Sequence, residues 1–167
     1  MAKISSESMS EQDIELLYET VRVAHFSLER GCFPFGALLV DSDKNILIEK
    51  GNNILDSTAL HSALLVMIEA GRRYSPLYLK SCSLYSNFEP CPMCTGAAYW
   101  ANIGRIVYGC SKEKLQELTS DDKRNPVFLL SPQDLLIHGQ KDIIVVGPTT
   151  DKKLIDSIIK DHINFWK

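Results

Sequence analysis

The stretch FEPCPMCTGAAYWANIGRIVYG, residues 88–109, decides how this chain folds. Its first half suits a helix with Pro92 in the first turn, and its GRIVYG end is typical of a strand. Cys91 and Cys94, separated by two residues, follow the strand-like SCSLYS at 81–86 and therefore lie at a strand-to-helix junction. Backbone amides and the dipole at the start of a helix favour negative charge, which supports binding of a cation by the two thiolates.

Outward from this stretch, helical and strand-like segments alternate along the chain. Apolar residues recur at helical spacing between 59 and 73, and Ser10 is the expected cap of a helix that ends near Gly31. Further expected helices are 111–118, 132–138 and 151–165, and the expected strands are 34–41, 45–53, 81–86, 104–110 and 142–147. The alternation predicts an α/β fold, a three-layer α/β/α sandwich with helices on both faces of one sheet.

Length and composition limit the class of protein. The chain has 167 residues, of which 45% are hydrophobic, enough for one sizeable core. We expect a frayed tail over the polar residues 1–10 and a single domain over 11–167. The net charge of −3 argues against bulk nucleic-acid binding, which requires many phosphate contacts. Without an apolar signal segment or a bilayer-length apolar run, a cytoplasmic protein with reduced thiols and no membrane partner is expected.

A third metal ligand is needed to complete a site around the two cysteines. A catalytic zinc usually takes three protein ligands and leaves its fourth tetrahedral position to water. His61, 30 residues before Cys91 and near the start of an expected helix, is the best candidate. The other three histidines have no ligand-like neighbours in the sequence: His25, His138 and His162. The sequence therefore predicts Zn²⁺ held by His61, Cys91 and Cys94.

These motifs resemble the zinc-dependent cytidine deaminase superfamily, whose signature is H-x-E followed by P-C-x-x-C. The resemblance extends to PFGALLV at 34–40, GNN at 51–53, DSTALHSA at 56–63 and TGAAYWANIGRIVYG at 95–109. It is nearest to the guanine, nucleoside and tRNA-adenosine deaminases, with cytosine deaminases next. The resemblance implies a cytidine-deaminase-like fold with a five-stranded mixed sheet, and a homodimer. It also implies hydrolytic deamination of a small nucleobase or nucleoside, with a guanine-like purine favoured over cytosine.

The family's catalytic glutamate is missing from this chain. In the family, zinc activates a water for attack on the carbon that bears the amine, and the Glu of H-x-E carries the proton. Here the motif reads His61, Ser62, Ala63, and alanine cannot carry a proton. Ala63 is either an engineered replacement in an otherwise complete site or a feature of a natural pseudo-deaminase that binds without catalysis. We favour the first, because the other motif residues are intact.

The substrate contacts are predicted by the same resemblance. Asn53 falls near a family position whose side-chain amide binds the base, although an Asn that ends a strand in a turn explains it equally well. Three aromatic residues near the motifs are candidates for stacking on a flat ring, or for ordinary core packing: Phe33, Phe35 and Phe88.

Two further candidates lie in the last third of the chain. Asp122, 28 residues past Cys94, matches the place where guanine deaminases carry an acidic residue that contacts the purine. A solvated loop carboxylate is the alternative. In guanine deaminases the C-terminal segment closes over a neighbouring subunit's site, and Trp166 is placed to do so here. Packing of this segment on its own core is the alternative.

Two other interpretations of the cysteine pair compete with a catalytic zinc. CPMC between a strand and a helix also suits a thiol–disulfide oxidoreductase, but that interpretation leaves His61 without a role. A structural zinc normally takes four protein ligands, and the sequence offers only three at suitable positions.

Overall fold

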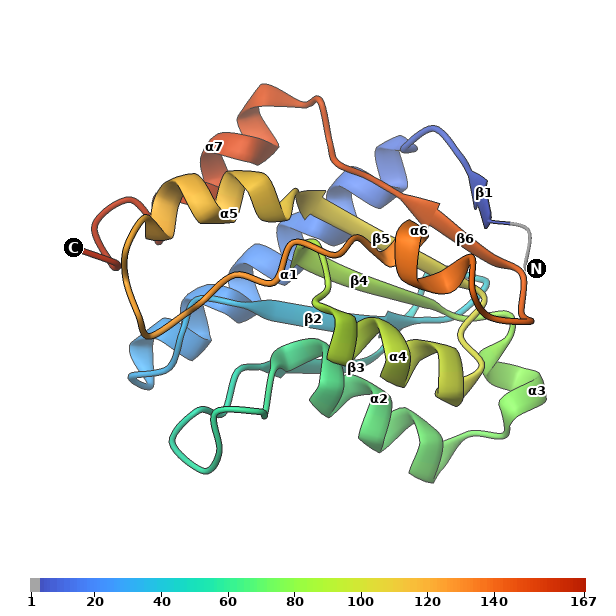
Figure 1. The fold of residues 1–167 in the computed structure, drawn as a ribbon. Coiled ribbons are helices and arrows are strands. Elements are labelled where there is room, and N and C mark those ends of the chain that lie inside the picture. Colours follow the sequence, from blue (N-terminus) through green and yellow to red (C-terminus); the bar gives the residue numbers. More distant parts are fainter. Residues whose placement is uncertain (1–3) are drawn as a thin grey trace.

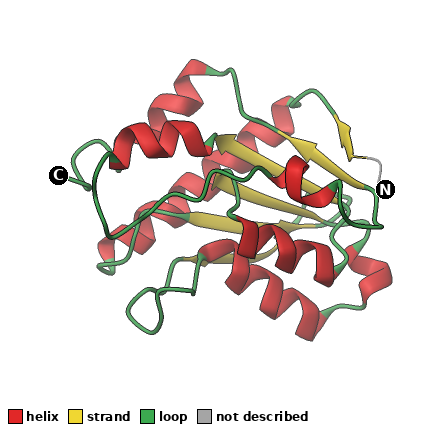
Figure 2. Ribbon diagram, in the orientation of Figure 1, coloured by secondary structure: helices red, strands yellow, loops and turns green. Residues whose placement is uncertain are grey.

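The computed structural model describes residues 4–167, which form one mixed sheet with helices on both faces (Figures 1 and 2). The six strands lie in the order β1-β6-β5-β4-β2-β3. β2 is antiparallel to β3 and β4, and the other neighbours are parallel. The strand bounds are β1 Ile4–Ser6, β2 Gly36–Val40, β3 Ile46–Gly51, β4 Ser83–Phe88, β5 Arg105–Cys110 and β6 Ile143–Val146.

The first strand corrects two predictions, a frayed tail over 1–10 and a sheet of five strands. Ile4 to Ser6 pair in parallel with Ile143 to Val145 and add a sixth strand at the edge of the sheet. An edge strand needs only one backbone partner, so a short polar segment can form it. Ile4 also packs against the core. Residues 1–3, also part of the predicted tail, lie outside the described residues.

Seven helices cover the sheet within the described residues. The core on one face joins α2, α4 and α6 to the strands, and the core on the other face joins α1, α5 and α7 to them. Neighbouring residues of β2 divide between the two cores: Ala37 and Leu39 belong to the first, Leu38 and Val40 to the second. The predicted sandwich is confirmed. The helices are α1 Glu11–Glu29, α2 Ser62–Arg73, α3 Pro76–Leu79, α4 Pro92–Ala101, α5 Lys112–Thr119, α6 Pro132–Leu136 and α7 Lys152–Lys160.

Helix ends follow local chemistry at the start of the chain and tertiary contacts at its end. Ser10 caps α1 through a capping box with Asp13, as its position predicts. The last helix is shorter than expected and ends at Lys160. From Asp161 the chain forms turns, and these bury the side chains of His162 and Trp166.

None of the helices in residues 4–167 combines the length and the apolar character needed to cross a bilayer.

Candidate metal centre and substrate pocket

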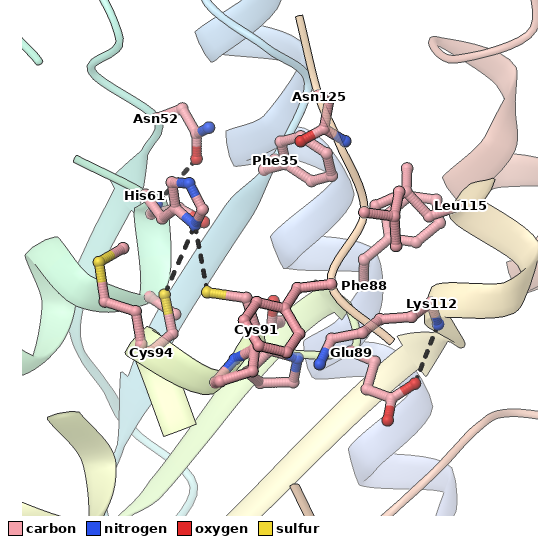
Figure 3. Close-up of a pocket in the computed structure, with 18 of the residues that line it drawn as sticks. Phe35, Asn52, His61, Phe88, Glu89, Cys91, Cys94, Lys112, Leu115 and Asn125 are labelled. Carbon is pink, nitrogen blue, oxygen red and sulfur yellow. Dashed lines mark hydrogen bonds between the residues drawn. The ribbon is translucent and has the colours of Figure 1, made fainter. Parts of the chain in front are cut away.

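The three predicted metal ligands converge at the first turns of two neighbouring helices (Figure 3). His61 is the N-cap residue of α2, Cys91 is the N-cap residue of α4, and Cys94 lies in the first turn of α4. Pro92 at the start of α4 suits a helix's first turn, because the missing N–H would have no partner there. The sequence therefore places all three ligands where free helix amides and dipoles favour negative charge.

The spacing of the ligand atoms fits a zinc ion. The Nδ1 of His61 lies 3.4 Å from the Sγ of Cys91 and 3.8 Å from the Sγ of Cys94. Tetrahedral zinc with ordinary bond lengths separates such nitrogen and sulfur atoms by roughly 3.5 Å. Within residues 4–167 this is the only group of three or more His, Cys, Asp or Glu side chains that could hold a metal ion. Three ligands leave the fourth position free, as in a catalytic site.

The thiols of Cys91 and Cys94 have pKa values shifted in opposite directions. Hydrogen bonds from Cys94 and His61 lower the pKa of Cys91 to about 4, although burial opposes them. The bond to Cys91, together with burial, raises the pKa of Cys94 well above its ordinary value. One thiolate is therefore already available at neutral pH, and a divalent cation would displace the second proton.

The three ligands lie in the wall of a cavity of about 410 Å³. A cavity of this size, with mostly apolar walls and a few polar groups, is typical of small-molecule sites. Phe35 contributes from just before β2, and the rest of the wall comes from the loop between β3 and α2, the end of β4, the starts of α2, α4 and α5, and the loop that follows α5. Its lining includes Phe35, Asn52, Thr58, His61, Ser62, Ala63, Ser86, Phe88, Glu89, Cys91, Cys94, Lys112, Leu115, Asn125 and Phe128.

Ala63, the third residue of the motif His61, Ser62, Ala63, lines this cavity. It is 3% exposed, two residues after the ligand His61, and presents only a methyl group. Glu69, on the same helix, pairs instead with Lys50 and Arg73 outside the cavity. The first turn of α2 thus supplies a metal ligand but no carboxylate.

Glu89 is the one carboxylate in the cavity lining, and it is already engaged. Its Oε2 accepts a hydrogen bond of 2.9 Å from the backbone N–H of Lys112, and burial raises its pKa. The Lys112 ammonium donates to the carbonyl of Leu130 at 2.6 Å, and burial lowers its pKa. This pair joins β4 to α5 and to the loop after it, which agrees with a structural role for Glu89.

The predicted substrate contacts divide into those the fold brings to the cavity and those it does not. Phe35 and Phe88 line the cavity, with ring centroids 5.7 Å apart. Phe33 packs edge-on against Trp166 instead. The amide of Asn53 donates to Asp56 outside the cavity. Its neighbour Asn52 is 2% exposed, lines the cavity and accepts a hydrogen bond from the backbone N–H of Ser62.

The two candidates from the last third of the chain, Asp122 and Trp166, do not line the cavity. Asp122 pairs with Arg124, whose Nε lies 3.0 Å from the carboxylate, and is not part of the lining. Trp166 is buried within its own chain and donates to His162 at 3.1 Å. Its ring also packs 6.3 Å from that of Phe35. The described chain therefore shows the C-terminal segment packed on its own core, and the homodimer stays a prediction.

Sequence reasoning missed several residues in the cavity wall. Asn125 and Phe128 come from the loop between α5 and α6, where the resemblance pointed to Asp122 instead. Lys112 carried no signal either, because its burial depends on Glu89 and Leu130. Asn52 could have been found, since it adjoins Asn53 in the same GNN stretch.

Nitrogen and sulfur ligands at two helix starts, beside a mixed sheet, define a metal-binding α/β protein of the catalytic zinc class. Residues 10–110 match the family model of the cytidine and deoxycytidylate deaminase zinc-binding region. A probable cytosine deaminase of Schizosaccharomyces pombe is 33% identical over 166 residues, which cover 98% of each chain. The chain belongs to the cytidine and deoxycytidylate deaminase family, whose members are zinc-dependent hydrolytic enzymes.

Other relatives act on different bases. A tRNA-specific adenosine deaminase of Buchnera aphidicola is 33% identical over 65% of this chain and 72% of its own. The solved structure of guanine deaminase from Bacillus subtilis is 30% identical, with a TM-score of 0.56 over 65% of this chain and 69% of the other. The family membership therefore leaves the base open.

Proposed function

We propose that this protein binds zinc and a free nucleobase in a site built for hydrolytic deamination, and that Ala63 leaves it nearly inactive. The observation that supports this proposal is that three zinc-type ligands and the methyl group of Ala63 line one cavity with aromatic walls. A flat aminated ring in this cavity has apolar surface to pack against, because Phe35 and Phe88 both line it and contact each other edge to face.

The chemistry divides between the metal and the protein. Zinc, when bound, supplies a Lewis acid that lowers the pKa of a water ligand toward neutrality. His61, Cys91 and Cys94 hold the metal, and the aromatic walls exclude bulk water from the ring. Deamination also needs a group that moves a proton from water to the ring and the departing ammonia. The first turn of α2 offers no such group, because Ala63 replaces the carboxylate.

The intact remainder of the site supports an engineered replacement at Ala63 more than a natural pseudo-deaminase. The three metal ligands, the buried Asn52 and the aromatic wall all meet in this one cavity. A chain without selection for catalysis would have little reason to keep them all. The loss of general acid–base catalysis alone lowers rates by roughly 10²–10⁴.

The proposed substrate is cytosine, and guanine is the alternative. The preference for a purine rested on the resemblance of the motifs, on the C-terminal segment and on Asp122, and Asp122 pairs with Arg124 outside the cavity lining. The relative that aligns over 98% of both chains is described as a probable cytosine deaminase. The guanine deaminase structure aligns over a smaller part of this chain and supports guanine as the alternative.

The decisive experiment restores the carboxylate. Zinc-loaded Ala63→Glu should release ammonia from cytosine, or from guanine, roughly 10²–10⁴ times faster than the parent chain. Ala63→Gln is the matched control, because it has the same size but cannot carry the proton. If Ala63→Glu folds and binds zinc but deaminates no base or nucleoside, the enzyme interpretation is wrong and a binding protein is indicated.

A further inference from the structure

The loop between α5 and α6 contains a buried amide without a partner. Asn125 lies in this loop, and its backbone N–H donates to the carbonyl of Asp122. Its side-chain Nδ2 is buried and makes no hydrogen bond. Within residues 4–167 no other buried side-chain nitrogen or oxygen lacks a partner. Buried polar groups are almost always paired, so an exception of this kind indicates a partner that arrives from outside the chain.

The same residue lines the cavity. Asn125 and Phe35 both line the cavity, and Figure 3 draws Cys94 on the other side of the view from Asn125. The other amide of the cavity wall, Asn52, uses its Oδ1 to accept from the backbone N–H of Ser62 at the start of α2. The side-chain nitrogen of Asn125 makes no such hydrogen bond within residues 4–167. A base in contact with Phe35 would bring one edge to the Asn125 amide.

The chemistry of the amide selects the kind of edge. A side-chain NH₂ donates and therefore needs an acceptor. A carbonyl oxygen projects about 1.2 Å beyond the ring and carries two lone pairs, so it reaches a donor in the cavity wall. Ring nitrogens lie within the ring edge and reach less far. The amino group that leaves must point to the metal ligands, so the carbonyl is the part of the base that remains for Asn125.

We propose that Asn125 selects the substrate by donating a hydrogen bond from Nδ2 to a ring carbonyl, so that the site takes bases with both an amine and a carbonyl. This inference rests on the proposed function and narrows its substrate class. Cytosine and guanine carry both groups, whereas adenine carries no carbonyl. Adenine would leave the amide unpaired, and a site with an unpaired buried donor discriminates against the ligand that fails to satisfy it.

The test compares bases with analogues that lack the carbonyl. Zinc-loaded parent chain is titrated calorimetrically with cytosine and with 4-aminopyrimidine, and with guanine and 2-aminopurine. The parent should prefer the carbonyl-bearing member of the bound pair by about tenfold to a hundredfold. Asn125→Ala should lose that preference, because the substitution lowers the affinity for the carbonyl-bearing base and leaves the affinity for the analogue nearly unchanged.

Two further variants separate recognition from folding. Asn125→Asp keeps the shape of the side chain but replaces the donor by an acceptor, so it should weaken binding of the carbonyl-bearing base at least as much. Asn45→Ala removes an amide from the exposed β2–β3 turn and should leave all affinities unchanged. Far-UV circular dichroism and zinc content show that each variant is folded and loaded.

The outcomes distinguish this inference from the proposed function. One outcome is that a base binds the parent chain, and Asn125→Ala lowers the affinities for the base and its analogue equally or changes neither affinity. The role of Asn125 is then overturned while the proposed function stands. If neither cytosine nor guanine binds the zinc-loaded parent chain, the proposed function fails and this inference fails with it. Preferential binding of adenine would overturn the carbonyl selection alone.

Discussion

The two ends of strands β4 and β5 carry polar clusters of opposite character. At the end where β5 begins, Asp13 of α1 accepts hydrogen bonds from Arg105 at 2.8 and 2.9 Å, from Tyr85 at 2.6 Å and from the backbone of Ser10. At the other end, past Phe88, lie the metal ligands and the Asn125 amide.

The difference separates structural polar groups from functional ones. The Asp13 cluster is fully buried at its carboxylate and its bonds are all made within the chain, so it can only stabilise. The other cluster offers groups to a ligand: three side chains that could hold a metal ion, and one amide nitrogen without an acceptor among the described residues. Unmet bonds cost stability unless a ligand supplies them, which is why they mark a site.

Removing a metal ligand should have the largest effect on this contrast. His61→Ala should lower zinc affinity by more than the roughly 10–100-fold that loss of a ligand's hydrogen-bond partner costs, because it removes a ligand directly. It should also abolish the rise in melting temperature that zinc gives the parent chain. Metal analysis after dialysis and thermal scans with and without zinc measure both. Cys32→Ser, a buried cysteine outside the cluster, should keep its zinc, and equal zinc binding by His61→Ala would contradict the assignment.

Disrupting the Asp13 cluster, a closed cluster in which every bond is made within the chain, should have the next largest effect. This effect should fall on stability alone. Asp13→Ala leaves the half-buried Arg105 without its main partner and should lower the free energy of unfolding by about 3–5 kcal/mol. Chemical denaturation measures this value, and Asp43→Ala on the exposed turn is the control. Zinc binding per folded chain should not change. A loss below about 1 kcal/mol would show that the cluster is not closed as described.

The closed cluster also has a pH signature. Burial pushes the pKa of Asp13 upward, but hydrogen bonds from Arg105, Tyr85 and Ser10 outweigh it and hold the pKa well below its ordinary range. A lowered pKa in the folded state means that the carboxylate stabilises above its unfolded pKa of about 3.9 and that this stability is lost as the pH falls below it. Asp13→Asn should remove that acid-dependent loss.

The smallest of these effects concerns His162, behind the cavity wall. Its Nε2 lies 2.8 Å from the carbonyl of Pro34, its ring packs against Phe35 and Phe88, and burial lowers its pKa to about 4. Protonation of His162 is therefore disfavoured in the folded state. Its contribution to the free energy of unfolding is fully present above about pH 6.5 and falls by about 3 kcal/mol as the pH drops toward 4. Denaturation curves over this range should lose the slope in His162→Gln. An unchanged slope would assign it to other groups, and His138→Gln, at an exposed position, is the control.

Much of the architecture could be predicted because it depends on local pattern. The cap at Ser10, the apolar strand-like run that becomes β2 and the proline at the start of α4 each act within a few residues. The sixth strand could not be predicted in this way. Residues 4–6 have little strand character of their own, and they become a strand because β6 offers an unpaired edge.

The sequence by itself determined the candidate metal ligands, because ligand type, the spacing of the two cysteines and the position of each ligand at a helix start are local properties. It also determined the prediction that Ala63 stands where the family carries its proton carrier, since the motif is contiguous. Only the tertiary structure decided which residues complete the pocket. Asn52 rather than Asn53 lines it, Asp122 is paired elsewhere, and Asn125 is left with an unmet bond. These outcomes depend on contacts between segments far apart in the chain, and local pattern carries no information about such contacts.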